Sequence, residues 1–306
     1  MNILFYTAGD NGANWLDALA RELPHATISV WPQKKATVDY ALVWKPPSDL
    51  IAALAGARAV FNLGAGVDAI PTASRWPVGL PLVRLEDAGM AEQMAEYVTY
   101  AALRCYREFA AYEMAQAADR WEPRPRLAKG SFGVGILGMG TLGSRVAQAL
   151  LALGFPVASW SRTRKELRDV KSFTADQLGL FLASCRLLVC MLPLTPATRG
   201  LLNRATLALL PEGAYVVNVA RGALLVDDDL LALIDSGHLS GAMLDVFEHE
   251  PLRSGHAFWH HPKITMTPHI SAITSVAQSV AQIADKIRRL EAGLAISGVV
   301  DVARAY

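Results

Sequence analysis

Short runs of apolar residues alternate with longer segments of helical periodicity along almost the whole chain. Helical patterns such as Trp15–Glu22 and Asp49–Gly56 separate the first of these runs from one another. Strands that alternate with helices are typical of βαβ units and of a mostly parallel sheet. The strands predicted in the first hundred residues are Asn2–Tyr6, Thr27–Val30, Ala41–Trp44, Ala59–Leu63 and Leu82–Leu85.

A second series of strands and helices begins at Gly133. Between the two series, residues 90–121 are predicted to form one long helical stretch, and the prolines at 123 and 125 make its continuation improbable. After Ser271 the pattern is helical again to about Gly293. The strands predicted here are Gly133–Leu137, Pro156–Trp160, Leu187–Met191, Ala214–Asn218, Gly241–Asp245 and Ile264–Thr267.

The two series predict an α/β fold with two doubly wound parallel-sheet domains. A length of 306 residues also suggests about two domains. The helical stretch near Ala91 and the C-terminal helix are interpreted as the two crossings between them. We therefore expect a discontinuous first domain, residues 1–96 and 282–306, with residues 97–281 inserted as the second.

Composition and charge exclude several classes of protein. Apolar residues make up 52% of the chain and charged ones 19%, which excludes an intrinsically disordered protein. The net charge of +1 provides no basic footprint for nucleic acid or for an anionic membrane. The longest apolar runs are far shorter than a membrane span, and the first residues lack a basic signal region. Three cysteines in apolar surroundings indicate buried thiols in a reducing compartment, so a cytoplasmic protein is expected.

A glycine-rich loop follows the first strand of the second series. Gly138, Gly140 and Gly143 form the pattern G-x-G-x-x-G between that strand and a predicted helix. The glycines permit a tight turn, a close approach of backbone to a pyrophosphate, and close packing of helix on strand. With Thr141 and Leu142 they are predicted to bind a dinucleotide at the helix N-terminus; the alternative is a tight turn without a ligand.

The end of the next strand indicates which dinucleotide binds. An acidic residue is typical there when NAD is bound, but this chain has Ser161 followed by Arg162, Thr163 and Arg164. An acid would repel a 2′-phosphate, whereas a hydroxyl and guanidinium groups would bind it. These four residues predict NADP in preference to NAD, although basic loops are also common on solvated surfaces.

Three polar residues follow strands of the second series, where ligands of open α/β sheets bind. Arg221 follows Ala214–Asn218, Glu250 follows Gly241–Asp245, and His269 follows Ile264–Thr267. A guanidinium can hold a carboxylate at two points, and a histidine paired with a carboxylate is a proton donor. Each residue alone could be structural, but together they suit the reduction of a 2-oxo acid.

The motifs that contain these residues resemble the D-isomer-specific 2-hydroxyacid dehydrogenase family. They are Gly138–Gly143, Ala220–Gly222, Asp245–Leu252 and Thr267–His269, and the match runs over nearly the whole chain. The resemblance implies a Rossmann cofactor domain inserted in a flavodoxin-like substrate domain. The segments Tyr40–Pro47 and Arg84–Met90 resemble, more narrowly, the reductases that act on glyoxylate and hydroxypyruvate with NADPH as homodimers.

Carried over to this chain, the resemblance assigns a role to each site residue and implies no metal. Arg221 binds the substrate carboxylate, His269 donates the proton, and Glu250 orients the His269 ring. Backbone N–H groups of Leu63, Gly64, Ala65 and Gly66 provide a second carboxylate grip, and the aromatic Trp44 is a candidate for the wall of the site. The further cofactor contacts expected are Met94, Leu192, Pro193, Val219, Asp245 and Ser271.

Other interpretations stay open at this point. A bulkier 2-oxo acid such as phenylpyruvate would leave the same motifs in place, because pocket volume is not readable from one sequence. A nicotinamide-binding sensor without catalysis is disfavoured by the intact Arg221, Glu250 and His269. Many relatives have two glycines after the histidine where this chain has Ile270-Ser-Ala-Ile. The four histidines at 249, 256, 260 and 261 invite a zinc interpretation, which we set aside.

Overall fold

The computed structural model describes residues 1–9, 12–33, 37–68, 70 and 76–302. The chain forms two compact units, here called the first unit (Met1–Gly89 with Thr274–Tyr306) and the second unit (Met90–Ile273). The sequence placed these boundaries seven or eight residues later, inside helices, whereas in the structure each connecting helix stays whole within one unit. Residues 303–306, expected in the first domain, lie outside the described residues.

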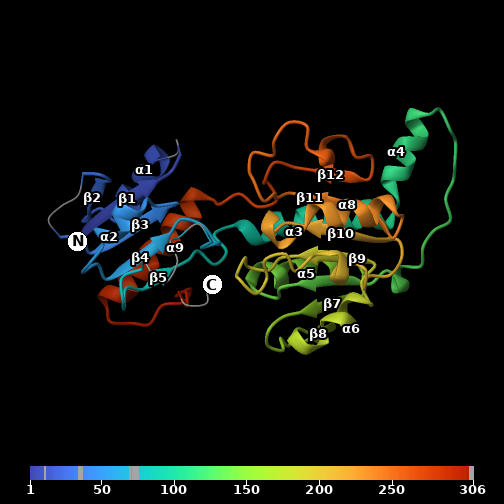
Figure 1. The fold of residues 1–306 in the computed structure, drawn as a ribbon. Helices are drawn as coiled ribbons and strands as arrows, with labels where there is room; N and C mark the ends of the chain where they lie inside the picture. The colour runs from blue at the N-terminus through green and yellow to red at the C-terminus, as the bar shows by residue number, and fades with distance from the viewer. Residues whose placement is uncertain (10–11, 34–36, 69, 71–75, 303–306) are drawn as a thin grey trace. The chain divides into compact units, whose positions relative to one another are not determined.

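The first unit is built on a parallel sheet whose described strands have the order β2-β1-β3-β4-β5 (Figure 1). This is the strand order of flavodoxin-like folds, as expected. The strands are β1 (Asn2–Thr7), β2 (Thr27–Val30), β3 (Tyr40–Trp44), β4 (Ala59–Asn62) and β5 (Leu82–Val83), and the helices are α1 (Gly12–Glu22), α2 (Ser48–Ala52) and α9 (Val276–Glu291).

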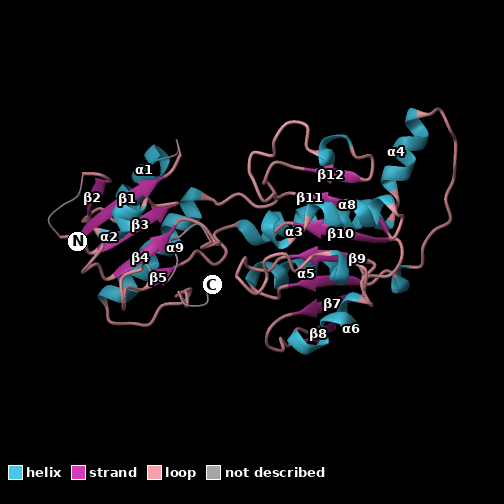
Figure 2. Cartoon of the chain, viewed as in Figure 1, coloured by secondary structure: helices cyan, strands magenta, loops and turns pink. Residues whose placement is uncertain are grey.

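The second unit has a longer parallel sheet, with described strands in the order β12-β11-β10-β9-β6-β7-β8 (Figure 2). The order reverses between β6 and β9, the switch point at which Rossmann folds bind dinucleotides. The predicted Rossmann domain is confirmed. Its strands are β6 (Val134–Leu137), β7 (Val157–Trp160), β8 (Val170–Phe173), β9 (Leu187–Cys190), β10 (Ala214–Asn218), β11 (Leu239–Leu244) and β12 (Ile264–Met266).

Helices cover both faces of this second sheet. Along β9, Leu187 and Val189 belong to one apolar cluster and Leu188 and Cys190 to another, because successive strand residues point to opposite faces. One cluster includes residues of α3 and α5, and the other includes residues of α6, α7 and α8. The helices are α3 (Met90–Tyr106), α4 (Phe109–Ala117), α5 (Thr141–Ala152), α6 (Leu178–Leu182), α7 (Arg204–Leu207) and α8 (Asp227–Asp235).

Two predictions about these elements were wrong. The long helical stretch from Met90 is two helices, because Glu108 takes a left-handed conformation with φ 54° before α4 begins. The edge strand β8 was not predicted, since two consecutive polar residues in its sequence Val-Lys-Ser-Phe interrupt the apolar pattern. Across the described helices, none has both the length and the apolar composition needed to cross a membrane.

Candidate functional site

The glycine-rich loop joins β6 to α5 in the geometry that its sequence predicts. Gly138 has φ 102°, a conformation that residues with a side chain rarely adopt. A Cβ there would lie 2.7 Å from the carbonyl oxygen of Met191, and one at Gly143 would collide with the carbonyl oxygen of Gly138. Glycine is therefore required at both positions, because backbone packs directly against backbone.

Gly140 differs from its two neighbours, because a Cβ at this position would meet no atom within 4 Å. It is the N-cap of α5, so Thr141 and Leu142 are the first two residues of the helix. Open space beside unpaired N–H groups and the positive end of a helix dipole fits a pyrophosphate. Met94 is buried in the apolar cluster that also contains Met139 of this loop.

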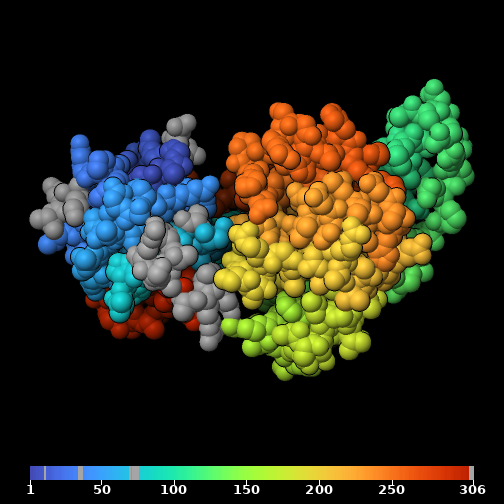
Figure 3. Space-filling view, in the orientation of Figure 1, coloured from blue at the N-terminus to red at the C-terminus, as the bar shows by residue number. Residues whose placement is uncertain are grey.

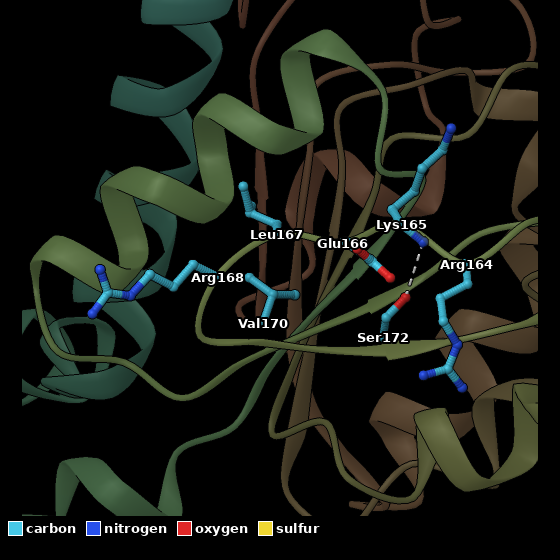
Figure 4. A pocket seen from close by; sticks show the side chains of 7 residues that line it. All are labelled: Arg164, Lys165, Glu166, Leu167, Arg168, Val170 and Ser172. Carbon is cyan, nitrogen blue, oxygen red and sulfur yellow. Dashed lines mark hydrogen bonds between the residues drawn. The ribbon is translucent and has the colours of Figure 1, made fainter.

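Basic residues line the region where β7 ends, at the expected ribose end of the dinucleotide. Ser161 is buried and its hydroxyl donates to the carbonyl oxygen of Thr163 at 2.7 Å, so its proton is directed at the loop itself. In Figure 4, Arg164 and Arg168 point to opposite sides. Here lies a pocket of about 330 Å³ lined by Arg164, Lys165, Glu166, Leu167, Arg168, Val170 and Ser172.

The remaining predicted cofactor contacts follow the carboxyl ends of β9, β10, β11 and β12. Leu192 is buried, and the carbonyl oxygen of Pro193 accepts from the Thr198 hydroxyl at 2.7 Å. The N–H of Val219 donates to the carbonyl oxygen of Cys190 at 3.3 Å. All of these lie at the sheet edge that carries the glycine-rich loop, since the strands are parallel.

Glu250 and His269 form a hydrogen-bonded pair. The Nδ1 atom of His269 lies 2.8 Å from Oε2 of Glu250, and Oε1 of Glu250 accepts from the N–H of Phe247 at 3.0 Å. The side chains are 42% and 36% exposed for His269 and Glu250. Because Nδ1 faces the carboxylate, Nε2 lies on the other side of the ring and is the nitrogen that can exchange a proton with a substrate.

Asp245 holds the turn that carries His269. Its buried carboxylate accepts from the Thr267 hydroxyl at 2.6 Å and from the N–H groups of Ile270 and Ser271 at 2.8 Å each. Its carbonyl oxygen accepts from the N–H of His269 at 2.8 Å. These bonds enclose a residue with φ 55° at His269, a conformation uncommon for a residue with a side chain.

Sequence reasoning missed two residues that support this turn, Tyr97 and Thr267. The hydroxyl of Thr267 donates to Asp245, so the Tyr97 hydroxyl donates to Thr267 across 2.5 Å. Burial raises the pKa of Tyr97 to about 12, so this hydroxyl remains a hydrogen-bond donor well above neutral pH. Tyr97 lies in an apolar helix, and the sequence carries no signal that its hydroxyl has a partner 170 residues away.

Arg221 lies in a well-packed loop at the end of β10. The buried Asn218 side chain donates to the carbonyl oxygen of Arg221 at 3.0 Å and accepts from the N–H of Ala220 at 3.2 Å. A Cβ at Gly222 would collide with the backbone of Phe247 and Glu248. The Arg221 loop is thus packed, backbone to backbone, on the loop that leads to Glu250.

In the first unit, the predicted carboxylate grip lies beside Trp44. Trp44 ends β3, and Leu63 follows β4, the neighbouring strand. A Cβ at Gly64 would lie 2.5 Å from the Trp44 ring, so the ring lies directly on the glycine backbone. The N–H of Leu63 donates to the carbonyl oxygen of Val43 at 2.9 Å, so the sheet already uses this donor, contrary to the expectation that Leu63 grips the carboxylate.

Two histidines of the histidine-rich loop pair with acids of α8. His256 lies 3.4 Å from Asp227 and His261 lies 3.1 Å from Asp235. Burial raises the pKa of Asp227. Across the part of the chain that the structure describes, no three His, Cys, Asp or Glu side chains gather as a metal site would require.

Comparisons with known proteins identify relatives over the full length. Residues 99–271 match the family model described as the D-isomer specific 2-hydroxyacid dehydrogenase NAD binding domain. Glyoxylate/hydroxypyruvate reductase A of Serratia proteamaculans is 47% identical over 313 residues, covering 100% of both chains.

Two solved structures are similar along the whole chain. A D-isomer specific 2-hydroxyacid dehydrogenase from Xanthobacter autotrophicus Py2, in complex with NADPH and MES, has a TM-score of 0.94 and 40% identity, covering 100% of this chain and 99% of that one. The NADPH-dependent glyoxylate/hydroxypyruvate reductase of Sinorhizobium meliloti, with NADP and sulfate, has a TM-score of 0.93 and 34% identity over the same shares.

Proposed function

Because the chain belongs to the D-isomer specific 2-hydroxyacid dehydrogenase family, we propose that it is an NADPH-dependent reductase of glyoxylate and hydroxypyruvate. The observation that carries the proposal is the Glu250–His269 pair, which lies at the same sheet edge as Arg221 and the dinucleotide loop. The 47% identity to a glyoxylate/hydroxypyruvate reductase A supports the choice of substrate. The products are the corresponding D-2-hydroxy acids.

Each side chain has a separate task in this reaction. Arg221 binds the carboxylate through its planar fork of donors. His269 gives the proton at Nε2 to the carbonyl oxygen, and Glu250 fixes the ring through Nδ1 and stabilises the imidazolium before transfer. NADPH, when bound, supplies the hydride that reduces the carbonyl carbon. Gly64, Ala65 and Gly66 present backbone donors to the carboxylate, and the Trp44 ring excludes water.

The proposal is tested by the loss of NADPH absorbance with glyoxylate, hydroxypyruvate, pyruvate and phenylpyruvate in parallel, each repeated with NADH. We expect the fastest turnover with glyoxylate or hydroxypyruvate and NADPH. A preference for phenylpyruvate would overturn the substrate assignment and leave the chemistry in place. Tight NADPH binding without turnover of any acid would indicate a cofactor sensor.

Replacing Arg162 and Arg164 by alanine should weaken NADPH binding far more than NADH binding. Each lost charged hydrogen bond costs about 1.5–3 kcal/mol, or roughly 10- to 150-fold in Kd. Titration by fluorescence measures both affinities. Arg168→Ala is the matched control, because Arg168 lines the same pocket but points to the opposite side and pairs with Asp169 (Figure 4). An unchanged NADPH affinity in the double variant would contradict the phosphate assignment.

We also propose a homodimer formed through α4 and residues 118–128. In Figure 3 this green segment stands out from the rest of the second unit, and Ala115 is the one buried residue described in α4. Trp121 is 97% exposed, and exposed apolar surface of this kind favours a partner. The other large apolar side chains exposed here are Phe109, Tyr112, Met114 and Leu127.

Exchanging Phe109 and Trp121 together for serine should convert the dimer to a monomer. The measurement is mass by light scattering during gel filtration. Leu180→Ser, at an exposed position of α6, is the control and should leave the mass unchanged. A dimer that survives the double exchange would place the interface elsewhere. We further propose a cytoplasmic location, which the free Cys105, Cys185 and Cys190 support.

A further inference from the structure

A buried asparagine ends β4, directly before the loop proposed to grip the carboxylate. Asn62 is 1% exposed in a strand whose other residues, Ala59, Val60 and Phe61, are apolar and buried. Burying an amide is costly unless its hydrogen bonds are made. Its Nδ2 atom makes two, to the carbonyl oxygens of Gly64 and Gly66, each at 2.8 Å.

These two bonds determine which way the loop presents its donors. In a planar trans peptide, the N–H of one residue points opposite to the carbonyl of the residue before it. With the carbonyls of Gly64 and Gly66 turned toward Asn62, the N–H groups of Ala65 and Val67 point away from it. The negative ends of these two peptide dipoles thus face Asn62, and the N–H groups of Ala65 and Val67 are left on the opposite side, where backbone donors can meet an anion.

A contact from the neighbouring strand keeps the loop from relaxing. The Trp44 ring lies against Gly64, where any Cβ would be 2.5 Å from the ring. The carbonyl oxygen of Gly64 also accepts from the N–H of Leu85 at 3.3 Å. Asn62, Trp44 and Leu85 therefore constrain the same short glycine loop.

The second unit repeats this arrangement at its own carboxylate-binding residue. Asn218 is the last residue of β10, is fully buried, and bonds to the backbone of Ala220 and Arg221. In both units a buried asparagine at a strand end organises the loop that follows. Asn62 thus has a counterpart beside a proposed substrate-binding residue, which argues against a role confined to filling the core.

We propose that Asn62 is a positioning residue for the substrate, which sets the orientation of the glycine loop so that the N–H groups of Ala65 and Val67 meet the carboxylate of a small 2-oxo acid. This inference rests on the proposed function, because it takes the carboxylate grip of that loop as its premise. Asn62 acts through the loop and touches neither substrate nor cofactor. Its loss weakens the carboxylate contact equally in the ground and transition states.

The test compares Asn62→Ala with the parent enzyme in steady-state kinetics with glyoxylate and NADPH. We expect KM to rise about tenfold, from two lost hydrogen bonds, with kcat within about twofold, the signature of lost uniform binding. The inhibition constant of oxalate, a dead-end carboxylate probe, should rise by the same factor. The Kd of NADPH should not change, because its site lies in the second unit.

Two further variants separate positioning from folding. Asn2→Ala removes one hydrogen bond of another asparagine in the same sheet, to Thr37 at 3.1 Å, and should leave KM unchanged. Asn62→Leu keeps the branched shape of the side chain, removes both N–H donors and should reproduce the rise in KM. If Asn62→Ala shows no cooperative thermal unfolding, Asn62→Leu takes its place in the test.

The outcomes distinguish the two proposals. If a folded Asn62 variant keeps the KM and the oxalate inhibition constant of the parent, the positioning role is overturned and the proposed function is not. A lower kcat together with a higher KM and weaker NADPH binding would also overturn the positioning role, since that pattern indicates general destabilisation of the protein. Failure of the parent enzyme to reduce either acid or to bind oxalate would instead overturn the proposed function.

Discussion

His269→Ala should lower kcat/KM for glyoxylate by about 10²- to 10⁴-fold, the usual contribution of a positioned general acid. The Nδ1 atom of His269 lies 2.8 Å from Oε2 of Glu250, which leaves Nε2 to deliver the proton. NADPH affinity should be unchanged, because the glycine-rich loop is not altered. Steady-state kinetics and a fluorescence titration of NADPH measure the two quantities.

The control for this variant is His260→Ala, which removes an exposed histidine of the nearby loop. It should leave kcat/KM within about twofold of the parent, as surface substitutions usually do. Activity of His269→Ala within about tenfold of the parent would contradict a general-acid role for this residue. Glu250 would then have no proton donor to orient, and the proposed mechanism would fail.

Arg221→Ala should reduce kcat/KM by roughly 30- to 4,000-fold, because truncating one partner of a hydrogen-bonded charge pair costs about 2–5 kcal/mol. Arg221→Lys should recover only part of this loss, since an ammonium cannot make the two-point contact of a guanidinium. The loss should be largest for acids with a free carboxylate, and the corresponding methyl esters measure that contribution.

Arg204→Ala is the matched control for the arginine, because Arg204 pairs with Asp229 on the surface at 3.5 Å and is 66% exposed. Such surface pairs contribute little to stability, so its kinetics should match the parent. Full activity of Arg221→Lys would show that charge alone suffices and would contradict the two-point grip. Equal losses with acid and ester would exclude a carboxylate contact altogether.

Much of the fold was predictable, because apolar runs and glycine patterns are local properties of the chain. The strands Thr27–Val30 and Ala214–Asn218 lie where the sequence placed them. The two wrong predictions of secondary structure also have local causes. Glu108 breaks the long helix without any proline or glycine to signal it, and β8 is an edge strand with an interrupted apolar pattern.

The residue types on which the proposed chemistry depends were likewise visible at strand ends. Arg221, Glu250 and His269 follow neighbouring strands of a parallel sheet, so their proximity could be inferred from topology. Their orientation could not. The hydroxyl of Ser161 was expected to face the phosphate, but its proton is directed at Thr163 in the structure.

The sequence by itself determined the two α/β domains and the dinucleotide loop, and it indicated the residue types that we propose for catalysis, because periodicity and turn chemistry depend on near neighbours. Only the tertiary structure decided which groups support them. The Tyr97 hydroxyl reaches Thr267, and Asp245 holds the turn around His269. The side chain of Asn62 holds the carbonyl oxygens of Gly64 and Gly66. The direction of each of these bonds depends on sheet register, helix packing and rotamers, and no local pattern in the chain encodes them.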